Sequence, residues 1–269
     1  MSKIGIMKSG KTDPSQSNTV QRRRILNEKS SFYVQEAYKT LRTNIRFSLG
    51  TGNNKKFCIT SSLASEGKSI TILNLAISFA QSGQKVLLID ADLRRPNLAR
   101  LLIEKSSPGL SNILAGLCGP EEGVRKEVYP NLDIIFSGEI PPNPSELLGS
   151  PRMKQLVDAM AGRYDYILMD APPVDIVSDA CIIANVLDGV LYLVRMNQTE
   201  KEAVAMGVKQ LELSGAKLMG FVLNGAEPEG VGHYGRKKYR YGYRYGYRYR
   251  YGYGYKYKYS YESADKKKK

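Results

Sequence analysis

The alternation of short apolar runs with stretches of helical spacing between residues 31 and 228 is the feature that most constrains the fold. Most of these runs are continuous, as in strands that are buried on both faces. Gly83 and Gly215 each follow a helical stretch and precede an apolar run, a usual place for a helix to end. The pattern predicts a doubly wound, mostly parallel α/β sheet with helices on both faces. The predicted strands are Phe57–Thr60, Val86–Ile89, Leu132–Phe136, Tyr166–Met169, Gly189–Val194 and Leu218–Leu223, and the predicted helices include Ile70–Gln81, Ser145–Met160 and Lys201–Leu213.

Charge divides the chain into three parts. The formal net charge is +14, but the excess of Lys and Arg lies at the two ends, and the middle is close to neutral. Residues 1–30 are polar and charged and predict a flexible N-terminal arm, residues 31–228 form the folded domain, and residues 229–269 are a low-complexity tail. The tail has almost no aliphatic residues to offset its ordering entropy, so we expect it to be disordered. The basic balance of the whole chain therefore says nothing about a nucleic-acid groove in the folded domain.

Cysteine usage and hydropathy indicate a cytoplasmic protein. Cys58, Cys118 and Cys181 are widely spaced and form no CxxC pair, as in a protein of a reducing compartment. The first residues have no apolar core of the kind that a signal peptide needs. No run approaches the ~18 apolar residues of a membrane span.

Residues 62–69 read Ser-Leu-Ala-Ser-Glu-Gly-Lys-Ser, a relaxed Walker A sequence with Ser62 in place of the first glycine. A predicted strand precedes it and a predicted helix follows it, and backbone N–H groups in this setting bind phosphates. Lys68 is expected to reach the β- and γ-phosphates of ATP, and the Ser69 hydroxyl to bind Mg²⁺. The alternative is a plain turn with an exposed lysine. The predicted nucleotide-binding residues here are Ser62, Leu63, Ala64, Ser65, Glu66, Gly67, Lys68, Ser69 and Ile70.

Two other predicted strands end in carboxylates. Asp90 and Asp92 follow one strand and Asp170 ends another. Ligands of doubly wound sheets bind beyond the carboxyl ends of the strands, so these acids are expected near the phosphate loop. Carboxylate oxygens suit Mg²⁺, which usually shares its ligands with substrate phosphates. Asp92 has an alternative role as a turn or N-cap residue.

The tail is rich in tyrosine: it holds 13 of the 19 tyrosines in the chain, and from Tyr239 onward they occupy every second position. Three interpretations are open. The tail is a strand with an aromatic face, a segment that stacks on single-stranded nucleic acid, or a tethered row of phosphorylatable phenols. The third makes these residues phosphate acceptors: Tyr239, Tyr241, Tyr243, Tyr245, Tyr247, Tyr249, Tyr251, Tyr253, Tyr255, Tyr257, Tyr259 and Tyr261.

The Walker A loop, the Asp-x-Asp strand end, Asp170 and the tyrosine cluster together resemble the bacterial tyrosine kinases, which are P-loop enzymes. The resemblance covers about residues 30–269 and is nearest to the Gram-positive type, in which the kinase is a separate cytoplasmic polypeptide. It implies an ATP-dependent protein-tyrosine kinase that autophosphorylates its tail, in trans, and regulates capsular or exopolysaccharide synthesis and export. It also implies a transmembrane activator that recruits the kinase to the inner face of the membrane through a cytoplasmic C-terminal segment. Protein-tyrosine substrates are implied, and no nucleic acid.

The resemblance also implies residue roles. Lys68 and Ser69 hold phosphate and magnesium, and Asp92 and Asp170 are magnesium ligands. Asp90 orients the attacking phenol and accepts its proton. Asn224 resembles the position at which related ATPases contact adenine, although an Asn-Gly turn explains it equally well.

A further element of the family, Glu-x-x-Arg-x-x-Arg, serves ring-like self-association. Glu36, Lys39 and Arg42 stand at its positions, with lysine in place of the first arginine. Lysine does not reproduce a bidentate guanidinium contact, so the contact is expected to be weaker or arranged differently. The alternative is the charged face of an ordinary helix.

Two rival functions remain at this stage. A partition- or division-type ATPase with a basic tail on DNA or membrane shares the fold, but such proteins typically carry an extra lysine early in Walker A, where Leu63 stands here. A non-catalytic nucleotide switch with a nucleic-acid-binding tail is the other. Phosphotyrosine formed from Mg-ATP separates the kinase from both.

Overall fold

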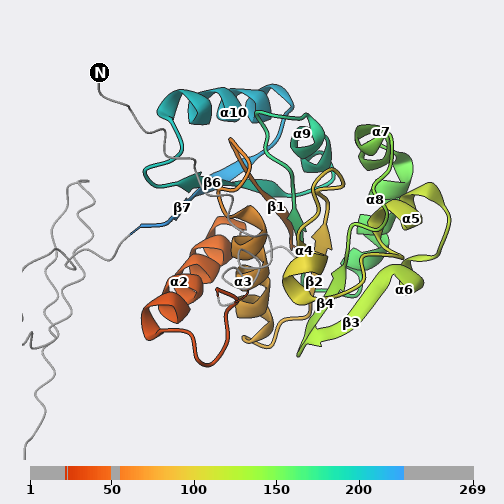
Figure 1. The fold of residues 1–269 in the computed structure, drawn as a ribbon, viewed down its shortest axis with the longest axis horizontal. Coiled ribbons are helices and arrows are strands. Elements are labelled where there is room, and N and C mark those ends of the chain that lie inside the picture. The colour runs from red at the N-terminus through yellow and green to blue at the C-terminus, as the bar shows by residue number, and fades with distance from the viewer. Residues whose placement is uncertain (1–21, 23, 50–54, 227–269) are drawn as a thin grey trace, which may run out of the picture. The chain divides into compact units, whose positions relative to one another are not determined.

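The computed structural model describes residues 22, 24–49 and 55–226. Their seven-stranded sheet has the order β3-β4-β2-β5-β1-β6-β7 (Figure 1). All neighbouring strands run parallel except β3 and β4. The strands are β1 Lys55–Ser61, β2 Val86–Asp90, β3 Val124–Tyr129, β4 Leu132–Ile135, β5 Tyr166–Asp170, β6 Gly189–Arg195 and β7 Leu218–Asn224. The main helices are α2 Phe32–Leu49, α3 Lys68–Ala80, α8 Pro151–Ala161 and α10 Lys201–Leu213, with shorter ones at α4 Leu98–Leu102, α5 Leu110–Ala115, α6 Pro120–Gly123, α7 Pro144–Leu148 and α9 Asp179–Ala184.

Two hydrophobic cores confirm a sheet that is covered on both faces. Along β1, Phe57 and Ile59 belong to the core that contains α3, while Cys58 belongs to the core that contains α8, α9 and α10. Figure 1 shows α2 and α3 below the sheet and α9 and α10 above it. Because successive strand residues point to opposite faces, the continuous apolar runs supply both cores. The predicted doubly wound architecture is confirmed.

The end of the predicted N-terminal arm contacts α3. Ile25 and Leu26 are buried in the same core as α3. The Asn74 side chain accepts a hydrogen bond from the Leu26 N–H at 2.8 Å and donates one to the Arg24 carbonyl at 2.9 Å. Asn74 therefore satisfies the backbone of this segment inside the core.

Two local features differ from the prediction. Strand β3 was not predicted, and the helix expected over residues 145–160 is interrupted between α7 and α8. Gly149 and Ser150 form the break, and Pro151 begins α8, where its missing N–H costs nothing. The spacing of apolar residues continues across this break, so the sequence pattern does not reveal that the helix is interrupted.

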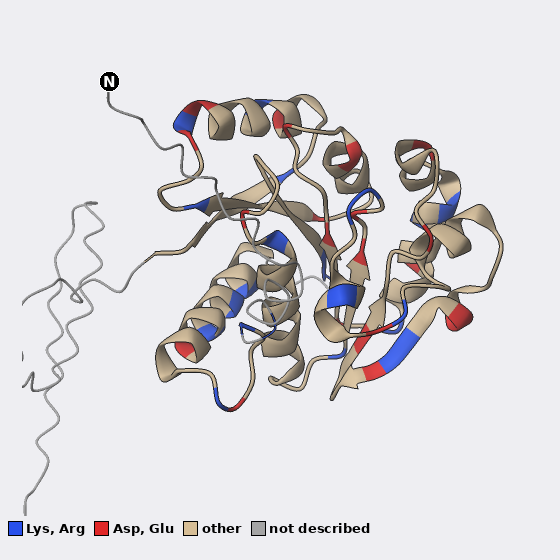
Figure 2. Cartoon of the chain, viewed as in Figure 1, with Lys and Arg blue, Asp and Glu red and all other residues tan. Residues whose placement is uncertain are grey.

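Charged residues of both signs are interspersed along the elements in the view of Figure 2, in agreement with a nearly neutral domain. Within the part of the chain that the structure describes, no helix is long and apolar enough to cross a membrane. The tail and its tyrosines lie outside the described residues.

Candidate active site

The phosphate loop connects β1 to α3 and includes two residues in the left-handed region. Ser65 has φ 66° and Gly67 has φ 102°. The positive φ of Gly67 favours glycine, and a Cβ there would lie 2.3 Å from Asn224 Nδ2 and so displace the Asn224 side chain. Ser69 and Ile70 lie in the first turn of α3. The strand, loop and helix predicted around residues 62–69 are thus in place.

Lys68 is folded back over the loop. Only 7% of its surface is exposed, and Nζ donates to Ser61 Oγ at 3.0 Å and to the Leu63 carbonyl at 3.3 Å. Burial lowers the pKa of Lys68, and the negative charges of Asp170, Asp92 and Glu66 oppose this shift. The alternative of an exposed lysine in a plain turn is therefore wrong. The ammonium group is thus held against the loop and not in solvent.

Asp90 and Asp170 end adjacent parallel strands and stand in register. Both are buried, and Leu98 N–H donates to Asp90 Oδ2 at 3.1 Å. The other Asp90 oxygen and both Asp170 oxygens have no hydrogen-bond partner. Burial, and then the neighbouring Asp170, raises the pKa of Asp90 well above its usual value. Burial raises the pKa of Asp170 to about 7, although Ser69 and Lys68 oppose this.

Asp92 is half-buried at the same end of the sheet. Its Oδ1 accepts a hydrogen bond from the Arg95 N–H at 2.9 Å, which is the turn contact considered as its alternative role. Its charge also acts on Lys68, Asp90 and Asp170. The structure thus brings the predicted carboxylates together and gives Asp92 a turn contact as well.

The donor set is compatible with a magnesium ion that shares its ligands. Buried carboxylate oxygens without partners are costly in apolar surroundings and suit a hard cation. The described residues contain no cluster of three or more His, Cys, Asp or Glu side chains arranged as a metal cage. A magnesium ion here would therefore depend on phosphate oxygens and water as well as on Asp170, Ser69 and Asp92.

Glu66 stabilises the loop from within. Its buried carboxylate accepts a hydrogen bond from the Leu63 N–H at 2.9 Å through Oε2, while Thr199 Oγ1 contacts Oε1. Thr199 Oγ1 also accepts a hydrogen bond from the Arg195 N–H at 2.8 Å. The Leu63 N–H is thereby used inside the loop. Thr199 is 133 residues from Glu66 and is part of no local motif, so the sequence does not reveal its role in the loop.

Asn224 lies beside the loop at the end of β7. Its Nδ2 donates to the Glu66 carbonyl at 2.8 Å. The Asn224 side chain thus stabilises the loop directly, whatever its contact with a base. The predicted adenine contact and the alternative of an Asn-Gly turn both stay open.

A second polar cluster, also missed in the sequence, follows Asp92. Arg94 Nε donates to the buried Asp179 Oδ2 at 2.7 Å, and its NH2 group donates to Ser145 Oγ at 2.8 Å. Ser145 Oγ donates to Asp179 Oδ1 at 2.6 Å. The arginine therefore connects the segment after β2 to α7 and α9.

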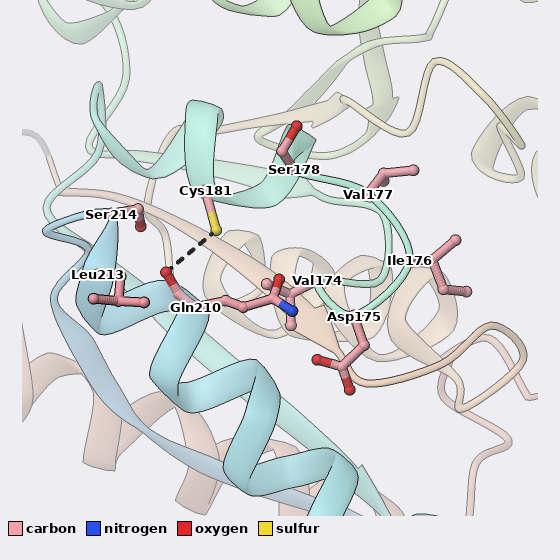
Figure 3. Close-up of a pocket in the computed structure, with 9 residues that line it drawn as sticks. All are labelled: Val174, Asp175, Ile176, Val177, Ser178, Cys181, Gln210, Leu213 and Ser214. Carbon is pink, nitrogen blue, oxygen red and sulfur yellow. Dashed lines mark hydrogen bonds between the residues drawn. The ribbon is translucent and has the colours of Figure 1, made fainter.

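A shallow groove of about 560 Å³ runs between the segment after β5, α9 and α10 (Figure 3). Cys181 Sγ donates to the Gln210 carbonyl across it at 3.7 Å. Burial raises the pKa of Asp175, which lines the groove, although the Ser62 hydroxyl opposes the shift. The groove is lined by Val174, Asp175, Ile176, Val177, Ser178, Cys181, Gln210, Leu213 and Ser214.

The three residues predicted for self-association lie on α2. Lys39 and Glu36 form an exposed ion pair at 2.7 Å. Arg42 points to the neighbouring helix α3, where it donates to the Ser78 carbonyl and, at 3.3 Å, to Ser78 Oγ. Their role between molecules stays a prediction.

Known proteins are similar to this chain in sequence and fold. The profile of the AAA domain matches residues 55–212. The tyrosine-protein kinase YwqD of Bacillus subtilis is 41% identical over 205 residues, which are 75% of this chain and 86% of that protein. The kinase domain of the Escherichia coli tyrosine kinase ETK is similar with a TM-score of 0.70 and 34% identity, covering 78% of this chain and 80% of that one. The cell division ATPase MinD of Pyrococcus furiosus, at 22% identity and a TM-score of 0.53, covers 63% of this chain and 71% of its own and shares the fold.

The match to the profile and the identity to YwqD define the class: the chain belongs to the AAA-domain P-loop proteins and, among them, to the bacterial tyrosine-protein kinases. It is a protein-tyrosine kinase. The predicted family, fold and enzyme class are confirmed.

Proposed function

We propose that this kinase transfers the γ-phosphoryl group of Mg-ATP to the tyrosines of its own C-terminal tail, from one molecule to another. The observation that carries the proposal is the pair of buried carboxylates, Asp90 and Asp170, with free oxygens beside the buried ammonium of Lys68. Such a site needs a cation and phosphate oxygens to satisfy it. The tail supplies phenols in the same chain.

Lys68 and the backbone N–H groups of the loop bind and orient the phosphates. The phenol oxygen attacks the γ-phosphorus, the bond from that phosphorus to the β–γ bridging oxygen breaks, and ADP leaves. The phenol proton passes to Asp90 Oδ1 late in the step. A free phenol has a pKa of about 10, and the raised pKa of Asp90 narrows the gap between donor and acceptor. Positioning and charge neutralisation supply most of the rate enhancement.

Magnesium, when bound, neutralises charge on the phosphates. Asp170 would hold it with Ser69, and Asp92 would contact it directly or through water. The two free oxygens of Asp170 support this assignment, because a cation would satisfy them without further rearrangement.

The biological setting follows from the resemblance to the Gram-positive type. In this proposal the kinase forms a ring through α2 and presents the tail of one molecule to the site of the next. A transmembrane activator recruits it to the inner face of the membrane through a cytoplasmic C-terminal segment, and the pair regulates capsular or exopolysaccharide synthesis. The exposed Glu36 and Lys39 on α2 support the ring, since both side chains are accessible to a neighbour.

A mixing experiment tests transfer between molecules. One chain carries Lys68→Met and an intact tail, and the other carries an intact Lys68 and phenylalanine at the twelve tail positions Tyr239 to Tyr261. With Mg-ATP, each alone is expected to give little phosphotyrosine, and the mixture is expected to phosphorylate the Lys68→Met chain. If that chain stays unmodified while the wild type modifies itself, transfer occurs within one molecule. A wild type that hydrolyses ATP without phosphotyrosine would favour a partition-type ATPase.

A further inference from the structure

Ser62 stands where the Walker A sequence usually has its first glycine, and it has a side chain that can form a hydrogen bond. Its Oγ lies 2.8 Å from the hydroxyl of Tyr192, and both residues are fully buried. Tyr192 is in β6, the strand next to β1, and none of its surface is exposed. The first residue of the phosphate loop is therefore connected by a side chain to the neighbouring strand.

The space for this hydroxyl comes from α10. A Cβ on Gly207 would lie 2.1 Å from the Tyr192 hydroxyl oxygen. It would also lie 2.8 Å from Asp175 Oδ1 and 2.8 Å from Val174 Cγ1. A side chain at position 207 is thus incompatible with the present position of the tyrosine. The ring of Tyr192 packs in a tilted arrangement on Phe221 of β7, with 5.8 Å between the ring centroids.

The surroundings keep the phenol protonated. Burial, with smaller effects of Asp175 and Glu66, raises the pKa of Tyr192 to about 12, although Ser62 opposes the shift. Asp175, which also lines the groove of Figure 3, lies close to the Tyr192 hydroxyl, since both are within 2.8 Å of the position that a Cβ on Gly207 would take. Tyr192 therefore remains able to donate to Ser62 over the physiological pH range.

We propose that Tyr192 is a positioning residue for the nucleotide, which holds the first residue of the phosphate loop through Ser62 and thereby aligns the backbone N–H groups that follow. The proposal rests on the use of this loop for Mg-ATP. Glu66 and Asn224 hold the loop at residues 63 and 66, whereas the Ser62 side chain bonds to Tyr192 and also acts on Asp175. A glycine at position 62 would have no such contact.

The test measures the dissociation constant for ATP with Mg²⁺ by calorimetry, together with kcat and the KM for ATP. The variants are Tyr192→Phe, Ser62→Ala and the two combined. Tyr166→Phe is the matched control, because Tyr166 is a buried tyrosine at the opposite end of β5 from Asp170. A hydrogen bond of ordinary net strength corresponds to about three- to tenfold in affinity.

Tyr192→Phe and Ser62→Ala are each expected to weaken ATP binding and to raise KM by about three- to tenfold, with kcat at saturation within about twofold. The double variant is expected to be no worse than either single one, since both remove the same bond. Tyr166→Phe is expected to bind ATP as the wild type does. Unchanged ATP affinity in Tyr192→Phe, additive losses in the double variant, or an equal loss in Tyr166→Phe would overturn the inference. A wild type that binds ATP but forms no phosphotyrosine would count against the proposed function alone, because the affinities still test the role of Tyr192.

Discussion

The two sides of the phosphate loop are built in opposite ways. On the side of β6 and β7, Glu66, Thr199 and Asn224 satisfy one another and the loop backbone. On the side of β2 and β5, Asp90 and Asp170 are buried with oxygens that have no partner. The satisfied side holds the loop in shape before any ligand arrives, and the unsatisfied side is stabilised when cation and phosphates bind. Preorganisation of this kind lowers the reorganisation needed during the reaction.

The largest effect is expected on the unsatisfied side. Lys68→Met keeps the aliphatic stem but removes the ammonium that faces the phosphates, and it is expected to lower the rate of phosphotyrosine formation on the order of 10²–10³-fold or more. Lys56→Met is the matched control, because Lys56 lies at the other end of β1, 4.0 Å from Asp158. Initial rates with Mg-ATP measure the effect, and circular dichroism verifies the fold. Equal rates for the two variants would contradict the assigned role of Lys68.

The second prediction uses the raised pKa of Asp170, which is about 7 in the folded chain. An unfolded aspartate has a pKa near about 3.9. Between these values the folded chain binds a proton that the unfolded chain has lost, so the stability that this group contributes falls as pH rises from about 4 to about 7. Asp170→Asn is expected to remove this part of the pH dependence and to make the ligand-free protein more stable at pH 8.

Urea unfolding of the ligand-free protein at pH 5 and pH 8 measures the difference. Asp158→Asn is the control, because Lys154 lowers the pKa of the exposed Asp158 and gives a small dependence of opposite sign. Added Mg-ATP should stabilise the wild type more than Asp170→Asn. If the stability of wild type and Asp170→Asn changed with pH in the same way, the pKa of Asp170 would not be raised in the folded protein.

On the satisfied side, Thr199→Val should have a smaller effect. Valine has nearly the same shape but leaves Glu66 Oε1 and the Arg195 N–H without their partner. The loss of stability is expected to be about 1–3 kcal/mol, with ATP binding weakened several-fold. Thr43→Val, on the exposed face of α2, is the control and should stay within about 0.5 kcal/mol. Thermal unfolding measures the loss of stability in Thr199→Val and Thr43→Val, and calorimetry measures their ATP binding. Equal effects in the two variants would mean that the Thr199 hydroxyl does not stabilise the loop.

The smallest effect on stability is expected away from the phosphate loop, for a change in the exposed ion pair of Lys39 and Glu36 on α2. Such pairs contribute about 0–1 kcal/mol, so Lys39→Ala should leave the melting temperature almost unchanged. Any loss of self-association then reports on contacts between molecules. Analytical ultracentrifugation of Lys39→Ala against Lys209→Ala, a change on the exposed part of α10, measures it. The same mass distribution for both would remove Lys39 from the interface.

The sequence predicts the sheet well, because six of its strands contain continuous apolar runs. Five of these strands are largely buried, whereas β7 is an edge strand on which Phe221 and Leu223 are exposed. Strand β3 is not predicted from the sequence, because Val124–Tyr129 is an antiparallel edge strand whose middle residues are charged and exposed. Charged edge residues discourage pairing with other chains and also hide the strand from pattern analysis.

Some residues of the candidate site can also be predicted from the sequence, and others cannot. Lys68, Asp90 and Asp170 are predicted from the sequence, because Lys68 belongs to the Walker A motif and each aspartate ends a strand. Their roles stay predictions. Thr199 and Arg94 are missed, since their partners are distant in the chain and meet them only through the sheet. The contact between Ser62 and Tyr192 had two signals in the sequence: a tyrosine within the apolar run of β6 and a glycine within α10.

The close approach at Gly207 also has a consequence for sequence variation. Positions 62, 192 and 207 are expected to vary together, because a side chain at 207 would displace the Tyr192 hydroxyl, as well as Asp175 and Val174, and the serine at 62 would then lose its partner. Related kinases that carry alanine at the position of Gly207 are therefore expected to lack tyrosine at the position of Tyr192. Anyone transplanting this phosphate loop into another P-loop scaffold would need to move three residues from three separate elements.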